Sequence, residues 1–295
     1  LTAETANANG VPGNTVLALG EFANAAGVAN VQVATGQTLT NSIQNVAEGK
    51  TDISAAPFIL PFLLSRGVGP YAKLGKDTGA EYADRLSVLY TYRLGVFTLS
   101  AYNSSSVKGW DSLEGKTIYN GPPRGAALTN ARGVVKLATG LGDGEGYTGV
   151  QVNWDQAVKT MTDGSADAFV LPSSFPDGRH TAAVASGGIT MWSMPKAAFE
   201  SDATQKYMKA PGSGKVDIPL SEAIQPEGVN VVSEDGRFRG VATVGGEVVR
   251  KDMDEELAYQ LTKAVLDNLD AIKSKTPFLP QVSLGEIADT ATTGM

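Results

Sequence analysis

The chain has 295 residues, of which 42% are hydrophobic and 19% charged, and its net charge is −7. This length is sufficient for a large core and for two domains. The absence of cysteine excludes disulfides and thiolate metal sites, and the lack of a basic run argues against nucleic acid as a partner. No apolar stretch reaches the roughly 18 residues that a membrane-spanning helix needs.

The first part of the chain predicts a β-α-β-α-β unit. Strands are expected at residues 1–5, 28–34 and 52–55, because these stretches are apolar or alternating and lie between turn signals. Asn14 is expected to cap the first helix. The second helix follows a turn, and we expect Gly49 to end it in a left-handed conformation.

Residues 86–102 are long and apolar but interrupted by Gly95, so we expect two strands there, the second crossing between two lobes. Residues 237–250 predict a strand that returns. The expected lobes are residues 1–102 plus 240–295, and residues 103–239. The expected hinge strands lie near residues 94–102 and 239–249, and hinge closure around a ligand is a standard motion of such proteins.

The second lobe repeats the plan of the first, with strands expected at residues 116–120, 149–153 and 167–171. Asp155 is expected to cap its second helix. Beyond it, Asp254 is expected to cap a strongly amphipathic helix that packs on the first lobe. Helices alternating with short strands predict an α/β fold with parallel sheets.

The repetition is visible in the letters themselves, since residues 42–58 align with residues 157–173 at an offset of 115 positions. Asp52 aligns with Asp167. Both aspartates are expected at the start of a strand, away from the edge where ligands bind, so we assign them to turn chemistry rather than to catalysis.

Ligands of open α/β sheets bind beyond the carboxyl ends of the strands, where helix N-termini present free N–H groups. A small anion suits such loops. The candidate ligand-binding residues are Asn9, Gly10, Asn14, Gly36, Gln37, Thr38, Phe58, Tyr92, Asn120, Pro123, Arg124, Gly125, Ala126, Trp154, Ser173, Ser174 and Phe175.

Arg124 stands out because it lies in the loop GPPRGA, where a guanidinium can hold a carboxylate through two hydrogen bonds. The alternative is an ordinary surface ion pair. For Gln37 and Thr38 the alternative to ligand contact is helix capping, and for the aromatic candidates it is core packing.

The sequence contains little that indicates a catalytic site. His180 is the only histidine and is expected within a helix, as a structural or solvated residue. The run GDGEG at residues 142–146 lacks the ligand spacing of a calcium loop and is interpreted as a turn. Without a nucleophile and base pair or a cofactor lysine, we expect no enzyme, no cofactor and no metal.

Residues 31–54 and 108–132 resemble the TAXI family of extracytoplasmic solute-binding subunits of TRAP transporters, and residues 149–172 and 248–270 are similar too. The resemblance implies a two-lobed type II periplasmic-binding-protein fold that closes on a ligand in the cleft between the lobes. It also implies delivery of that ligand to a membrane permease driven by an ion gradient.

The first loop, ANANGVPGN at residues 6–14, departs from the Gly-Ser/Thr-Gly-Gly run that many members carry. Members that bind glutamate-like amino acids are therefore a poor guide, and a small organic anion is the expected ligand. The start of the chain fits removal of a leader, so we expect a periplasmic monomer. The alternatives are a ligand-sensing domain of a signalling system and an enzyme on the same scaffold.

Overall fold

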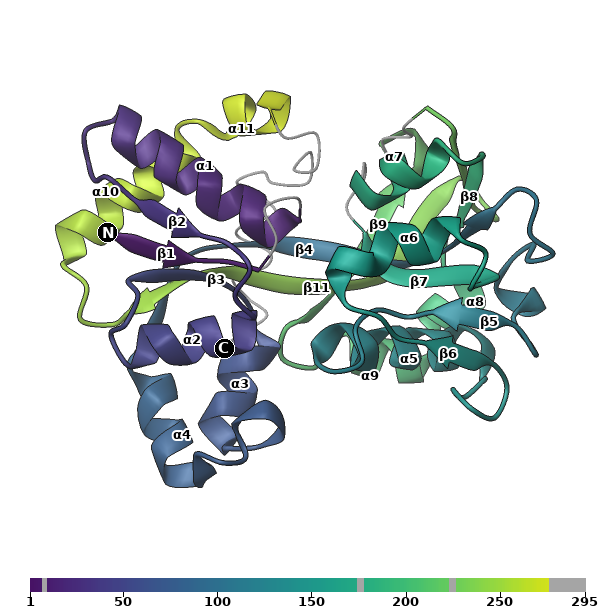
Figure 1. Ribbon diagram of the computed structural model, residues 1–295, viewed down its shortest axis with the longest axis horizontal. Coiled ribbons are helices and arrows are strands. Elements are labelled where there is room, and N and C mark those ends of the chain that lie inside the picture. Colours follow the sequence, from purple (N-terminus) through teal and green to yellow (C-terminus); the bar gives the residue numbers. More distant parts are fainter. Residues whose placement is uncertain (7–9, 174–177, 223–226, 276–295) are drawn as a thin grey trace. The chain divides into compact units, whose positions relative to one another are not determined.

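The computed structural model describes residues 1–6, 10–173, 178–222 and 227–275 (Figure 1). The chain forms two compact units. Unit 1 comprises residues 1–94 and 244–295, and unit 2 comprises residues 95–243. Two long strands run from one unit into the other, so each unit is described below by itself.

The unit 1 sheet has the strand order β2-β1-β3-β11-β4. Its strands are β1 (Thr2–Glu4), β2 (Gln32–Ala34), β3 (Ile53–Pro57), β4 (Leu86–Tyr102) and β11 (Arg237–Arg250). Strand β1 is parallel to β2 and β3, whereas β11 is antiparallel to β3. The central position of β11 and its burial on both faces fit its apolar stretch from Val241 to Val249, which only Thr243 and Glu247 interrupt.

Helices cover both faces of this sheet (Figure 1). The helices of unit 1 are α1 (Val11–Ala25), α2 (Leu39–Ala47), α3 (Ile59–Arg66), α4 (Gly75–Asp84), α10 (Glu255–Leu266) and α11 (Leu269–Lys275). Helices α1, α10 and α11 share one core cluster, and α2, α3 and α4 share another. The two clusters occupy opposite faces, because side chains alternate along each strand.

Unit 2 repeats this layered plan. Its further strands are β5 (Thr117–Tyr119), β6 (Thr148–Val150), β7 (Ala168–Ser173), β8 (Ile189–Trp192), β9 (Ser213–Pro219) and β10 (Val229–Val232). Its helices are α5 (Ala126–Thr139), α6 (Ala157–Thr162), α7 (Gly178–Val184), α8 (Lys196–Glu200) and α9 (Asp202–Tyr207). The order β4-β7-β5-β6 forms the main sheet, while β8 pairs with β4 and β10, and β9 pairs with β11.

Several sequence predictions are confirmed, including the return strand at residues 237–250 and the caps of two helices. Asp254 accepts a hydrogen bond from the Leu257 N–H at 2.9 Å. Gly49 follows the C-cap of α2 with φ of +73°, the left-handed conformation that glycine adopts without strain.

Other predictions are wrong. Residues 86–102 form one strand rather than two. Gly95 does not interrupt this strand; its lack of a side chain lets the β7 backbone approach closely, since a Cβ there would lie 3.2 Å from the Ser173 carbonyl oxygen. Helix α1 begins at Val11 with Gly10 as N-cap, so Asn14 lies inside the helix instead of capping it. Asp155 lies in the short 3₁₀ helix η3 (Trp154–Gln156) and provides no cap.

The repeated aspartates tie neighbouring strands together. The Asp52 carboxylate accepts a hydrogen bond from the Thr2 N–H at 2.7 Å, and Asp167 accepts one from the Thr117 N–H at 2.8 Å. Each aspartate therefore joins the start of its own strand to the start of the parallel strand beside it. The same clasp in both units accounts for the match in sequence and gives both residues a structural role.

The other conspicuous motifs are structural as well. His180 is buried, and its Nε2 atom lies 2.9 Å from the Ser100 hydroxyl. In the GDGEG segment, Asp143 accepts hydrogen bonds from the Arg132 side chain and the Gly149 N–H, both at 2.7 Å. The segment is thus a turn held by an ion pair.

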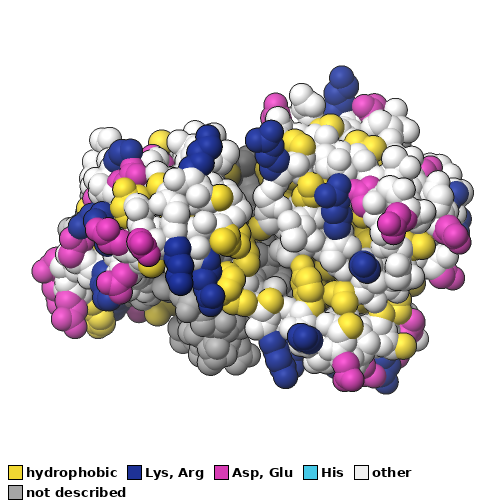
Figure 2. Space-filling view, turned by 90° about the horizontal axis from the view of Figure 1, so that it is seen from below, with side chains coloured by type: hydrophobic (Ala, Val, Ile, Leu, Met, Phe, Trp, Pro, Cys, Tyr) yellow, Lys and Arg dark blue, Asp and Glu magenta, His cyan; other side chains and the backbone are white. Residues whose placement is uncertain are grey.

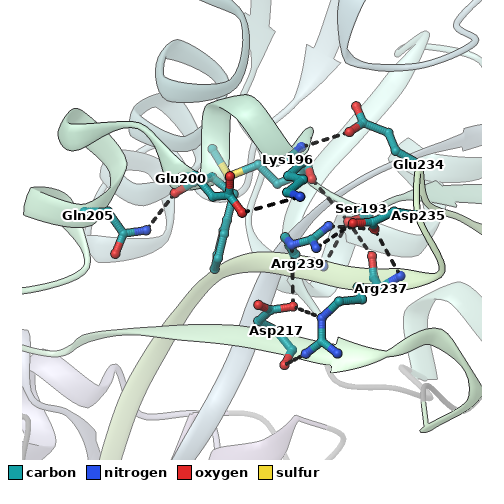
Figure 3. Close-up of polar contacts among 11 residues, drawn as sticks. Ser193, Lys196, Glu200, Gln205, Asp217, Glu234, Asp235, Arg237 and Arg239 are labelled. Atoms are coloured by element: carbon teal, nitrogen blue, oxygen red, sulfur yellow. Dashed lines mark hydrogen bonds and ion pairs between the residues drawn. The ribbon is translucent and has the colours of Figure 1, made fainter.

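A charged network links β9, β11 and the segment before β11 (Figure 3). The buried Arg239 guanidinium donates two hydrogen bonds of 2.8 Å to Asp235, which lowers the pKa of that carboxyl to about 2. Arg237 donates to Asp217 at 2.7 Å. Each carboxylate has a guanidinium partner, and we assign the network to the stability of unit 2.

Candidate ligand-binding site

The loops that follow β1 and β2 in unit 1 are joined to each other. The Gly36 N–H donates to the Ala6 carbonyl oxygen at 2.5 Å, and the Gln37 N–H donates to the Thr5 carbonyl oxygen at 3.3 Å. Gly36 has φ of +92° and is exposed. These loops lie beyond the carboxyl ends of parallel strands, the position at which open α/β sheets bind ligands.

The side chains of Gln37 and Thr38 serve the start of α2. Thr38 is its N-cap, and its hydroxyl accepts a hydrogen bond from the Asn41 N–H at 3.4 Å. The Gln37 side-chain oxygen accepts from the Thr38 N–H at 2.9 Å and from the Asn41 amide. Helix capping therefore accounts for both side chains, whereas Gly36 beside them carries no side chain that could obstruct a ligand.

The aromatic candidates of unit 1 lie in its interior. Phe58 is only 2% exposed and precedes α3, and Tyr92 on β4 is 1% exposed. Gly10 is partly exposed at the start of α1. Asn9, together with Ser174 and Phe175 of unit 2, lies outside the described residues.

In unit 2 the structure brings the loops after β5 and β6 together. The Asn120 N–H donates to the Val150 carbonyl oxygen at 3.1 Å, and the Gln151 side chain donates to the Asn120 side-chain oxygen at 2.8 Å. Ser173 at the end of β7 is buried and accepts a hydrogen bond from Thr98 at 3.3 Å. The carboxyl ends of these parallel strands therefore carry a cluster of amide and hydroxyl groups.

Trp154 lies at this end of the unit 2 sheet and has a partner that the sequence did not reveal. The Arg179 guanidinium lies 4.9 Å from the centre of the Trp154 ring, a cation–π contact, and it donates a hydrogen bond to the Pro172 carbonyl oxygen. Burial raises the pKa of the nearby Tyr119 hydroxyl to about 12, and the positive charge of Arg179 opposes that rise.

The sequence did contain a signal for Arg179 as a candidate ligand-binding residue, since it lies a few residues after the Pro172 loop and directly before His180. An arginine that contacts the tip of a parallel strand is placed where an anion would bind. The planar guanidinium can stack on a ring and still present N–H groups along its edge.

Arg124 occupies the loop between β5 and α5. It is exposed and forms no ion pair among the residues that the structure describes. Pro123 is exposed beside it, Gly125 is the N-cap of α5 with φ of +99°, and Ala126 is the first residue of that helix. In the described part of the chain, Arg124 therefore has no acidic partner for the alternative role of a surface ion pair.

The surface shown in Figure 2 carries lysine and arginine side chains singly or in small groups, between acidic and apolar ones. Among the described residues, no group of three or more histidine, aspartate or glutamate side chains is arranged to hold a metal ion. Within the same residues, no helix combines the length and the apolar character that crossing a membrane requires.

Comparison with protein families gives one match, which extends over residues 16–293 and is described as the NMT1-like family. The chain belongs to the NMT1-like family. No curated protein sequence matches this NMT1-like chain.

Solved structures with the same fold are periplasmic solute-binding proteins. One is a TRAP solute-binding protein from Ralstonia eutropha H16 with bound (S)-2-acetolactate (TM-score 0.51, 13% identity, covering 100% of this chain and 84% of that one). Another is a TRAP solute-binding protein from Desulfovibrio desulfuricans with bound sn-glycerol-3-phosphate (TM-score 0.51, 12% identity, covering 94% and 78%). A third is the sulfonate-binding protein SsuA from Methylobacillus flagellatus KT (TM-score 0.51, 14% identity, covering 97% and 73%).

At these identities the likeness concerns the fold alone. The NMT1-like chain has the α/β, two-lobed fold of type II periplasmic binding proteins, as the sequence predicted. Proteins of this kind bind small ligands and work with membrane transporters.

Proposed function

We propose that the protein is an extracytoplasmic solute receptor of a TRAP-type transporter, of the TAXI kind, and that it binds a small organic anion for delivery to the membrane permease subunits. It acts in the periplasm as a monomer and catalyses no reaction. Family membership and the fold support the receptor role, and the TAXI-like sequence blocks support the transporter type.

The main support for an anionic ligand is the pair of arginines at the carboxyl ends of the unit 2 strands. Arg124 follows β5 and is exposed without an ionic partner among the described residues, while Arg179 is held against Trp154 beside the end of β7. Guanidinium groups bind carboxylates and similar anions through charge-assisted hydrogen bonds. The anions present in two of the structural neighbours, 2-acetolactate and glycerol-3-phosphate, agree with this ligand class.

Thermal-shift screening and calorimetric titration test the proposal, with acetate, pyruvate, succinate and glutamate as anionic probes and glucose as a neutral probe. A probe at 100 times its Kd adds about 2.7 kcal/mol to the free energy of unfolding. Arg124→Ala and Arg179→Ala each remove a charged donor, so each should weaken binding at least tenfold, or about 1.4 kcal/mol.

Lys136→Ala is the matched control, because Lys136 is an exposed cation on α5 away from the strand ends. It should bind the probe like the wild-type protein. A response to glucose alone would contradict the anionic ligand, and unchanged affinity in both arginine variants would remove them from the site.

A further inference from the structure

One row of side chains on the unit 1 sheet is polar although it faces the core beneath α1. Glu247 of β11 is paired with Ala55 of β3, and the register that pairs Glu4 with Ser54 places Thr5 at the level of Ala55. Residues at one level of a sheet point to the same side. Ala55 belongs to the core cluster under α1, so Thr5 and Glu247 point toward that helix.

Two tyrosines of β4 and the first turns of α1 complete this row. The Tyr92 hydroxyl donates to one Glu247 oxygen at 3.2 Å and lies 2.8 Å from the Thr15 hydroxyl, which donates to it. Tyr90 lies two residues before Tyr92 on the same face, and Asn14 precedes Thr15 on the helix. We call Thr5, Asn14, Tyr90 and Glu247 the polar row.

Each member of the polar row has a buried atom without a hydrogen-bond partner. These atoms are the Thr5 hydroxyl, the Asn14 amide nitrogen, the Tyr90 hydroxyl and the second Glu247 carboxyl oxygen. Thr5 and Glu247 are 0% exposed and Tyr90 is 5% exposed. The Tyr90 hydroxyl also lies near enough to the Glu247 carboxyl to influence its pKa. Buried polar groups in native proteins nearly always have partners, so the polar row retains hydrogen-bonding capacity for a further group.

The protonation state of Glu247 decides what that partner is. Burial raises the pKa of its carboxyl to about 8, and Thr15, Tyr90 and Tyr92 only partly oppose this rise. The pKa values of Tyr90 and Tyr92 are also raised by burial. Tyr90 and Tyr92 of β4 are the titratable groups that act on the carboxyl, and Thr15 of α1 is its other polar neighbour.

Glu247 is therefore a neutral acid at pH 7, and all four unsatisfied atoms can donate a hydrogen bond. We propose that the polar row is the subsite of unit 1 that binds the oxygen-bearing end of the ligand, a carboxylate or keto group. This inference rests on the proposed function and assigns to Glu247 the role of a donor that binds through its proton.

The position of the polar row fits this role. Thr5 immediately follows the carboxyl end of β1, and α1 begins a few residues later, which is where open α/β sheets bind small ligands. Several convergent hydrogen-bond donors replace the water that an oxyanion loses when it is buried. When Glu247 loses its proton, the site instead presents a carboxylate to the ligand, and binding weakens.

The test is a calorimetric titration of acetate, pyruvate and succinate between pH 6 and pH 9. Wild-type affinity should be constant up to about pH 7 and fall about tenfold per pH unit above pH 8, because binding then requires uptake of a proton. Glu247→Gln retains a donor of the same shape, so it should bind with no such pH dependence. Thr5→Val should weaken binding at every pH.

Ser54→Ala is the matched control, since Ser54 is buried in the same sheet but points to the opposite face. It should reproduce the wild-type affinity and pH profile. Circular dichroism verifies that each variant is folded, and Thr5→Val tests the polar row independently of Glu247.

The outcomes are distinguishable. If Glu247→Gln and Thr5→Val both keep the wild-type affinity and pH profile, the polar row is not the subsite although the receptor function stands. If affinity rises with pH and methylammonium competes with the probe, the carboxyl binds a cation and the inference is wrong. If wild-type protein binds glucose and none of the anionic probes, the proposed anionic ligand fails and this inference fails with it.

Discussion

The buried carboxyl of Glu247 gives a quantitative prediction about stability without any ligand. Its pKa is about 8 in the folded protein, raised by burial from 4.5. Between these values the folded protein holds a proton that the unfolded chain releases, so this contribution is fully present below pH 4.5 and is lost as pH rises to 8. One pKa unit corresponds to 1.36 kcal/mol, so the two units between pH 6 and pH 8 correspond to about 3 kcal/mol.

Glu247→Gln removes the titration and retains the shape of the side chain. We expect the wild-type protein to lose about 3 kcal/mol of unfolding free energy relative to the variant between pH 6 and pH 9. Urea unfolding followed by circular dichroism at both pH values measures this difference, and other titrating groups cancel because both proteins carry them. Wild-type and variant stabilities that run parallel over this range would refute the reasoning.

Three further predictions concern stability. In thermal unfolding, Gly79→Ala should destabilise the protein by about 2 kcal/mol, because the new Cβ would lie within 3.0 Å of a backbone oxygen of α3. Gly20→Ala in α1 has room for the Cβ and should stabilise the protein by about 0.5 kcal/mol. Asp235→Asn should reduce the urea midpoint more than Arg239→Met, since it leaves a buried guanidinium with only the 3.5 Å contact to Asp217; the reverse order would contradict this. Asp52→Ala should cost about 1 kcal/mol in urea unfolding and leave the Kd for a bound probe unchanged; weaker binding would give Asp52 a further role.

The order of helices and strands was largely predictable, because both units alternate apolar strands with amphipathic helices and end several helices at glycine. The single strand at residues 86–102 was not predictable, because Gly95 resembles an interruption until the neighbouring β7 backbone is known to approach it. Asn14 is a favourable cap residue, but Gly10 and Pro12 start the helix a turn earlier.

The candidate site was less accessible to prediction, because its geometry depends on which segments meet. The loops after the parallel strands were found from topology rules, and Arg124 from its glycine and proline neighbours. Arg179 was missed although it closely follows the loop after Pro172, because its contact with Trp154 joins residues 25 positions apart. Glu247 was missed although its signal was present, as a lone carboxylate within the apolar strand sequence GVATVGGEVVR.

The place of β11 in the unit 1 sheet also determines the order in which the protein can fold during synthesis. Strand β11 lies between β3 and β4, yet the ribosome makes the part of β11 that belongs to unit 1 only after all of unit 2. Unit 2 is one uninterrupted segment and can complete its core while the chain is still growing. The earlier strands of unit 1 must wait more than a hundred residues for the strand that joins them, and until then the adjacent edges of β3 and β4 are exposed to chaperones and to mispairing.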